Sequence, residues 1–332
     1  MDNWQQSGVQ PWLPWEQERA VRLTTAFAAG GLHSGVLLKG AKDLGKRGFA
    51  ARFAAFLICD NAGSEHGASG LFESELNSAA QTMTACSHCA SCALLAAGTH
   101  PDLHVMQPEP GKKQIGVDLV RALNETLLKT PQVAARRVSV IDAVDQLNEH
   151  AANALLKLLE EPPEHTYFIL IADHLDRVLP TIRSRCQSES FGIPERAPAI
   201  SYLCERYQQT EAQVEELWQK NRGFPGRVIS LLDGEAVDDS LAEEFLQVLT
   251  SRQSCLSLSK QITRDNVDLF AENCLRRLAQ PEGFSLGADV QMALFARVQR
   301  FRAALGANPN LTAALLAFFD DCTHLVSEQK AH

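Results

Sequence analysis

The order of apolar and amphipathic segments limits this chain to a fold with two different halves. From Ser34 to Phe191, short apolar runs alternate with stretches of helical spacing, which is the pattern of βαβ units around a parallel sheet. After Ile193, the apolar residues recur only at helical spacing. The sequence therefore predicts an α/β half followed by an all-α half.

Short apolar runs mark the expected strands, and the last of them is apolar enough for a central, fully buried strand. These runs are Val36 to Lys39, Leu103 to Met106, Val138 to Ile141 and Tyr167 to Ala172. Amphipathic helices are expected between them, and Pro162-Pro163 ends one at Glu160, because proline lacks the amide donor and restricts the residue before it. In the second half, the expected helices are Ala199 to Tyr207, Glu211 to Lys220, Leu241 to Thr250, Val267 to Leu278, Val290 to Leu305 and Thr312 to Val326.

Length and charge set the scale of the molecule and limit its partners. At about 150 residues per domain, the 332 residues predict two or three domains, and loop signals near Gly223 and Asp233 divide the helical half. The chain has 31 basic and 40 acidic residues, a formal charge of −9, which argues against broad electrostatic attachment to nucleic acid or anionic lipid. Any contact with DNA is expected to use local patches or partner proteins.

The chain is expected to be a soluble, cytoplasmic protein that does not contact a membrane. No apolar run is long enough to span a bilayer, and the first residues, MDNWQQSGVQPW, lack the basic and apolar regions of an export signal. Nine cysteines without such a signal favour thiols or metal-bound thiolates over disulfides.

The segment Gly40 to Arg47, GAKDLGKR, matches the phosphate-binding pattern G-x-x-x-x-G-K but has Arg47 where a hydroxyl should hold magnesium. Asp43 adds a negative charge where a polyphosphate would lie, and small residues are usual there. ATP hydrolysis at this loop is therefore not expected. Lys46 either retains weak nucleotide binding or belongs to a plain strand-to-helix turn.

A second part of such a site lies in RVSVIDAVDQL, Arg137 to Leu147. Asp142 ends an expected strand, where P-loop folds hold magnesium, but the next residue is Ala143 rather than the carboxylate that would polarise the attacking water. This is a defect independent of Arg47. The run by itself is weak evidence, since many Rossmann-like strands have similar sequences.

Cysteines form a knuckle with the spacing of a metal site. Cys86, Cys89 and Cys92 follow each other at two-residue gaps, and 26 residues rich in Gly, Ser and Ala separate Cys59 from Cys86. Together they predict a four-cysteine zinc site, in which filled coordination leaves no position for a reacting water. The identity of the fourth ligand has alternatives, because Cys59 ends an apolar helix, where a buried free thiol is common, and because His88 and His100 lie nearby.

Arg183 and Arg185 lie in LPTIRSRCQ, directly after the expected buried strand. An arginine here is either an ordinary salt-bridge partner or an arginine finger that stabilises charge on a neighbouring subunit's γ-phosphate.

Several of these segments together resemble a known family. NALLKLLEEPPEHTYFILIA followed by TIRSRC, with the cysteine knuckle and the altered phosphate loop, is similar to the delta-prime family of the bacterial DNA polymerase III clamp loader. The resemblance begins near Pro11-Trp12, continues through THPDLHVM and IGVDLVRAL, and fades in the C-terminal helices. The absent hydroxyl and the absent glutamate select delta-prime over the active gamma/tau branch.

The resemblance implies an α/β AAA+, P-loop-like domain over 1–192 with a zinc module at 59–92, a small helical lid over 193–236 and an all-α collar domain over 237–332. It implies Arg185 as an arginine finger acting in trans, and Lys46 and Asp142 as remnants of a nucleotide site that does not hydrolyse ATP with Mg²⁺. Its zinc ligands would be Cys59, Cys86, Cys89 and Cys92. Gly226 stands where active relatives keep a nucleotide-sensing arginine, with Arg227 one position later.

The function implied is that of a hetero-oligomer subunit that helps load the sliding clamp on primed DNA, with delta and gamma/tau as partners. Two alternatives remain: an active gamma/tau-like ATPase, and a zinc-ribbon nucleic-acid-binding protein. The acidic charge, and the lack of aromatic residues around the knuckle, count against the second.

Overall fold

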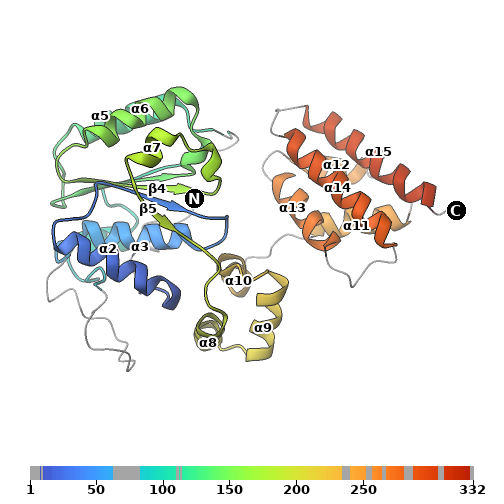
Figure 1. The fold of residues 1–332 in the computed structure, drawn as a ribbon, viewed down its shortest axis with the longest axis horizontal. Helices are drawn as coiled ribbons and strands as arrows, with labels where there is room; N and C mark the ends of the chain where they lie inside the picture. The colour runs from blue at the N-terminus through green and yellow to red at the C-terminus, as the bar shows by residue number, and fades with distance from the viewer. Residues whose placement is uncertain are drawn as a thin grey trace. The chain divides into compact units, whose positions relative to one another are not determined.

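The computed structural model divides the chain into two compact units, residues 1–233 and 234–332, and each is described by itself (Figure 1). It describes residues 8, 10–62, 83–109, 112, 114–233, 240–251, 256–263, 267–279, 287–305 and 310–329. Most of the segment between Cys59 and Cys86, whose Gly-, Ser- and Ala-rich composition predicts a surface excursion, lies outside these residues.

A parallel sheet of five strands forms the centre of the first unit, in the order β2-β3-β4-β1-β5. Every pairing is parallel, as the alternating sequence pattern predicts. The strands are β1 (Gly35–Lys39), β2 (Leu103–Met106), β3 (Arg137–Asp142), β4 (Thr166–Ala172) and β5 (Gln187–Ser190). The edge strand β5 has no counterpart among the apolar runs, because Gln187–Ser190 (QSES) contains only polar residues.

Helices cover both faces of this sheet (Figure 1). One face carries α2 (Gln17–Ala28), α3 (Lys46–Ile58) and α4 (Ala90–Ala96), and the other carries α5 (Val117–Leu127), α6 (Glu149–Glu160) and α7 (Pro180–Ser184). Side chains alternate along each strand, so Ile169 joins the α3 core while its neighbour Leu170 joins the α6 core. This explains why β4 is apolar at nearly every position.

Three further helices complete the first unit around a small core of their own. They are α8 (Arg196–Tyr207), α9 (Glu211–Lys220) and α10 (Pro225–Leu232). The short 3-10 helix η1 (Pro14–Glu16) packs against them, with the Trp15 and Tyr202 rings edge to face at 5.7 Å. The helix α10 was not expected, since Gly223 to Gly226 has the composition of a loop; Pro225 instead begins the helix.

The second unit is all helical in the part that the structure describes. Its helices are α11 (Ser240–Ser251), α12 (Leu256–Gln261), α13 (Val267–Leu278), α14 (Ala288–Leu305) and α15 (Leu311–Gln329), and they enclose a core that includes Phe245, Phe270 and Phe319. The helical C-terminal region is therefore confirmed. Among the described residues, no helix has both the length and the apolar character needed to cross a membrane.

A buried carboxylate organises the turn that leads into β3. The side chain of Asp102 accepts hydrogen bonds from the backbone N–H groups of Gln132, Val133 and Ala134, at 2.8, 2.8 and 2.9 Å. Burial opposes ionisation of this side chain, but the three donors outweigh burial and lower the pKa of Asp102 below its ordinary value of 3.8. The carboxylate is therefore a structural anchor for this turn.

We expect Asp102→Ala to lower the free energy of unfolding by about 2–3 kcal/mol, because three buried donors would lose their acceptor. Since the folded-state pKa is lowered, the contribution of Asp102 is present above pH 3.8 and is lost as the pH falls through that lower pKa. Urea unfolding at pH 7 and at acidic pH measures both effects. An equal difference between variant and parent at pH 7 and at a pH where Asp102 is protonated would contradict this role.

Candidate functional site

The phosphate-type loop joins β1 to α3, and its lysine is bound by the chain itself. Gly45 has φ = 87°, a left-handed conformation suited to glycine, and Lys46 begins α3. The Lys46 Nζ lies 2.7 Å from the Gly40 carbonyl oxygen, 2.6 Å from that of Ala41 and 2.6 Å from Asp173 Oδ1. All three ammonium donors therefore have acceptors within the protein, and the side chain is only 3% exposed.

The residue in the usual hydroxyl position forms an ion pair with the strand-end carboxylate. The Arg47 Nε lies 3.0 Å from Asp142 Oδ2 and 3.1 Å from Oδ1, and the Asp142 side chain is buried at the end of β3. A guanidinium thus lies between the two positions that hold magnesium in a working P-loop. The next residue, Ala143, has φ = 69° and provides no carboxylate.

The third charged group of the loop binds to helix α10. Asp43 has φ = 66°, and its carboxylate lies 2.8 Å from Arg227 Nε, while its carbonyl oxygen accepts the Gly226 N–H at 2.9 Å. A Cβ on residue 226 would lie 2.7 Å from that oxygen, so the close approach requires glycine. Gly226 therefore has a packing reason in this fold, and Arg227 neutralises the acidic residue in the loop.

Arg185 follows α7, at the edge of the first unit's sheet, and its side chain remains 38% exposed. Its Nη2 lies 2.5 Å from Glu160 Oε1 at the end of α6, and its Nη1 donates to the Thr181 carbonyl oxygen at 3.2 Å. This geometry is compatible with an ordinary salt bridge and with an arginine finger, because Arg185 has an ion-pair partner and its side chain is accessible from solvent.

The knuckle residues converge with Cys59 into one cluster of sulfur atoms. The Sγ atoms of Cys59, Cys86, Cys89 and Cys92 all lie within 4.8 Å of one another. The Cys59–Cys89 and Cys86–Cys92 sulfur pairs are each 3.9 Å apart. Zinc–thiolate bonds of about 2.3 Å in tetrahedral geometry place sulfur atoms just under ~4 Å apart, so the four sulfur atoms have the spacing of a zinc site. The structure thus brings Cys59 to the knuckle.

The two histidines that were alternatives for the fourth ligand are not part of this cluster. His88 donates from Nδ1 to the Cys86 carbonyl oxygen at 2.6 Å, and His100 Nδ1 accepts the Asp102 N–H at 3.1 Å. Within the described residues, the group with metal-ligand geometry consists of the four cysteines.

The chemistry of the cluster also suits a cation. A hydrogen bond from Cys92 lowers the pKa of Cys59 to about 5 against the opposing effect of burial, and the same contact raises the pKa of Cys92. Without a metal, the cluster therefore favours one thiolate and keeps a neighbour protonated. A divalent ion would allow all four sulfur atoms to lose their protons.

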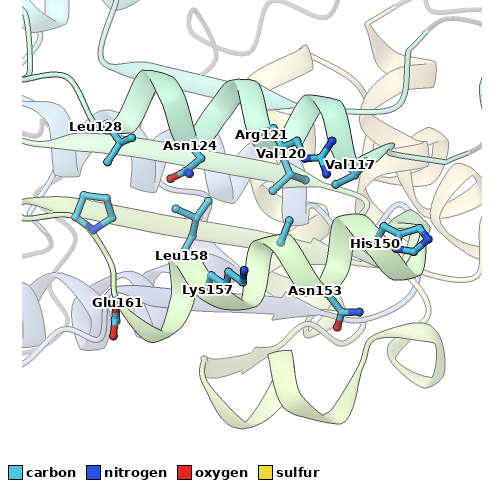
Figure 2. A pocket seen from close by; sticks show the side chains of 12 residues that line it. Val117, Val120, Arg121, Asn124, Leu128, His150, Asn153, Lys157, Leu158 and Glu161 are labelled. Atoms are coloured by element: carbon cyan, nitrogen blue, oxygen red, sulfur yellow. The ribbon is translucent and has the colours of Figure 1, made fainter.

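A pocket of about 740 Å³ lies elsewhere, between α5 and α6 (Figure 2). Val120 and Leu158 form apolar parts of its lining, while Arg121, His150 and Lys157 add polar groups along the helices. None of the predicted site residues lines it. Helix α3, which follows the phosphate-type loop, packs on the other face of the sheet, so this pocket is separate from the loop.

Sequence reasoning missed three contacts of the site, which join Lys46 to Asp173, Arg185 to Glu160 and Asp43 to Arg227. Asp173 follows a buried strand directly, which is a weak signal, because carboxyl ends of neighbouring parallel strands meet at one edge of a sheet. Contact with Lys46 follows only once β4 is known to lie beside β1. Nothing in the local sequence relates Asp43 to a helix that begins 182 residues later.

A family model described as DNA polymerase III, delta subunit, matches residues 15–194. DNA polymerase III subunit delta' of Escherichia coli K12 is 30% identical over 68% of this chain and 62% of the relative, and that of Pseudomonas aeruginosa is 36% identical over 62% and 58%. These two matches span less than two thirds of each relative. Subunit delta' of Haemophilus influenzae is 30% identical over 83% of this chain and 81% of the relative.

Among solved structures, a gamma subunit-related protein of DNA polymerase III from Thermotoga maritima has a TM-score of 0.49 at 16% identity, covering 94% of this chain and 99% of that one. The RuvB Holliday junction branch migration motor from the same organism has a TM-score of 0.43 at 16% identity, covering 86% and 75%.

Proposed function

Because the chain belongs to the DNA polymerase III delta' family, we propose that it is the clamp-loader subunit that does not hydrolyse ATP itself. In this proposal it assembles with delta and gamma/tau and presents Arg185 to ATP bound by an adjacent gamma/tau subunit. Through the assembled complex it acts on the sliding clamp and primed DNA. Residues 193–236 would serve as the lid and 237–332 as the collar domain.

The observation that carries the proposal is the ion pair between Arg47 and Asp142. Hydrolysis by a P-loop site needs a hydroxyl and a strand-end carboxylate on magnesium, which neutralises charge on the phosphates. Here a guanidinium replaces the hydroxyl and engages the carboxylate, so a magnesium ion would have to displace an ion pair and would then lack one protein ligand. Ala143 removes the residue that would activate water.

Two further contacts support the same conclusion. A phosphate could reach Lys46 only by displacing the Gly40 and Ala41 carbonyls and the Asp173 carboxylate. Asp43, held by Arg227, keeps a carboxylate in the loop where phosphate oxygens would lie. The chain's own groups thus occupy the loop residues that a nucleotide would have to contact, whereas Arg185 is partly exposed and accessible to a neighbouring subunit.

We expect the purified chain alone to show no magnesium-dependent ATP turnover above a buffer blank. The Lys46→Ala variant is the matched control, because it removes the lysine on which loop-bound ATP would depend. Turnover by the parent that disappears in Lys46→Ala would contradict the proposal and favour the active gamma/tau-like ATPase. Mixing the chain with delta and gamma/tau subunits tests assembly, and a single defined complex in size-exclusion chromatography is the expected result.

A separate titration tests the zinc-ribbon alternative. We expect the isolated chain to bind DNA weakly, because its charge is −9 and the cluster carries no aromatic platform. Tight DNA binding that weakens steeply with added salt and depends on the cysteines would favour a nucleic-acid-binding role instead.

A further inference from the structure

The guanidinium of Arg185 is held at two points by its own chain. Glu160 Oε1 lies 2.5 Å from Nη2, and the Thr181 carbonyl oxygen accepts from Nη1 at 3.2 Å. A guanidinium carries five N–H donors in a rigid plane. Two contacts therefore orient the group and leave other donors, including the Nε–H, for an incoming phosphate.

Glu160 is well placed to orient a flexible side chain, because it belongs to a rigid element. It is the last residue of α6, whose preceding residues Leu158 and Leu159 are buried in the core beneath the sheet face. Pro162 stops the helix two residues later, which sets where α6 ends. Arg185, in contrast, follows the five-residue helix α7.

The ion pair between Glu160 and Arg185 is expected to contribute little to the free energy of folding. The Glu160 side chain is 46% exposed and that of Arg185 is 38% exposed, and solvent-exposed pairs contribute about 0–1 kcal/mol to folding. An arginine side chain carries about 2 kcal/mol of rotamer entropy, which a finger loses when it binds a phosphate in a fixed geometry. A carboxylate that orients the guanidinium beforehand lowers that loss.

We propose that Glu160 is a positioning residue for Arg185, holding the guanidinium in the orientation in which it meets the neighbouring subunit's ATP. This inference rests on the proposed function and adds a second residue to it. Glu160 does not contact the nucleotide in this proposal; it acts through Arg185.

The test is single-turnover ATP hydrolysis by the reconstituted complex, with Glu160→Ala in this chain. We expect the rate constant of the phase that depends on Arg185 to fall on the order of tenfold. This is more than the loss of an exposed ion pair would cause and less than the loss caused by moving a catalytic group out of place. The KM for ATP and the amount of complex formed should not change. Glu160→Gln, which keeps an oxygen acceptor without the charge, should fall between parent and Glu160→Ala.

Glu161→Ala is the matched control, because Glu161 is the adjacent exposed carboxylate in the same Glu-Glu-Pro-Pro segment, lies along the α5–α6 pocket and has no ion pair among the described residues. It should hydrolyse ATP at the parent's rate. The decisive comparison is the double variant: in an Arg185→Ala background, Glu160→Ala should cause no further loss.

A structural role for Glu160 would instead lower the rate equally in both backgrounds, and that result would overturn the inference. The inference about Glu160 would also be overturned if Glu160→Ala had the parental rate while Arg185→Ala was strongly impaired. That result would leave the proposed function of Arg185 intact. If Arg185→Ala itself has the parental rate, both the finger and its positioning residue are wrong.

Discussion

Replacing Arg185 by alanine is expected to slow hydrolysis at the adjacent subunit's ATP site by about 10³-fold or more, the effect of removing an arginine finger. Charge accumulates on the γ-phosphate oxygens in the transition state, and the guanidinium stabilises that charge more than it stabilises bound ATP. The KM for ATP should therefore change little while the rate constant falls. Single-turnover hydrolysis by the reconstituted complex measures this directly, because the affected site is seen as a lost phase.

Clamp loading onto primed DNA should fall with hydrolysis, while assembly of the complex should not change, since the Arg185 side chain is partly exposed and bonded to exposed groups. Arg183→Ala is the matched control, because Arg183 is an exposed arginine two positions earlier on α7. Arg185→Lys should restore only part of the rate, because an ammonium cannot make the planar, two-pronged contact of a guanidinium. A parental rate for Arg185→Ala would show that this arginine is only a surface ion-pair partner.

Loss of zinc is expected to have the largest effect on stability. We expect the purified chain to contain about one zinc ion, and Cys92→Ser to lose that ion together with on the order of 5 kcal/mol of unfolding free energy. Cys92 is buried, and its sulfur lies 3.9 Å from that of Cys86, so its replacement opens the cluster. Elemental analysis measures the metal, and urea unfolding measures the stability.

Cys204→Ser provides the control, because Cys204 lies on α8, apart from the cluster. This variant should keep its zinc and unfold close to the parent. Removing the metal from the parent chain with a chelator should reproduce the lower stability of Cys92→Ser, and added zinc should restore the parent alone. A parent chain that binds no zinc and unfolds at the same urea concentration as Cys92→Ser would contradict the metal site.

Much of the local structure could be predicted from the periodicity of apolar residues and from prolines that end helices. The apolar run before Asp173 predicts β4 because side chains on both faces of a central strand are buried. The helix before Pro162-Pro163 ends as predicted, at Glu160, because proline blocks its continuation. The polar edge strand β5 and the helix that begins at Pro225 were missed, since each depends on its neighbours more than on its own composition.

In the candidate site, too, features within one segment could be predicted from the sequence, whereas most contacts between distant segments could not. The residue types within one segment were enough to find the altered phosphate loop, the missing carboxylate at Ala143 and the three-cysteine knuckle, since each motif depends on local spacing. Other pairings between distant segments came only from the folded chain: Lys46 with Asp173, Asp43 with Arg227, and Glu160 with Arg185. The sequence proposed Cys59 as the fourth metal ligand, and the fold places it, rather than His88 or His100, at the knuckle. Strand order and helix packing bring those side chains together, and neither is encoded in the spacing of nearby residues.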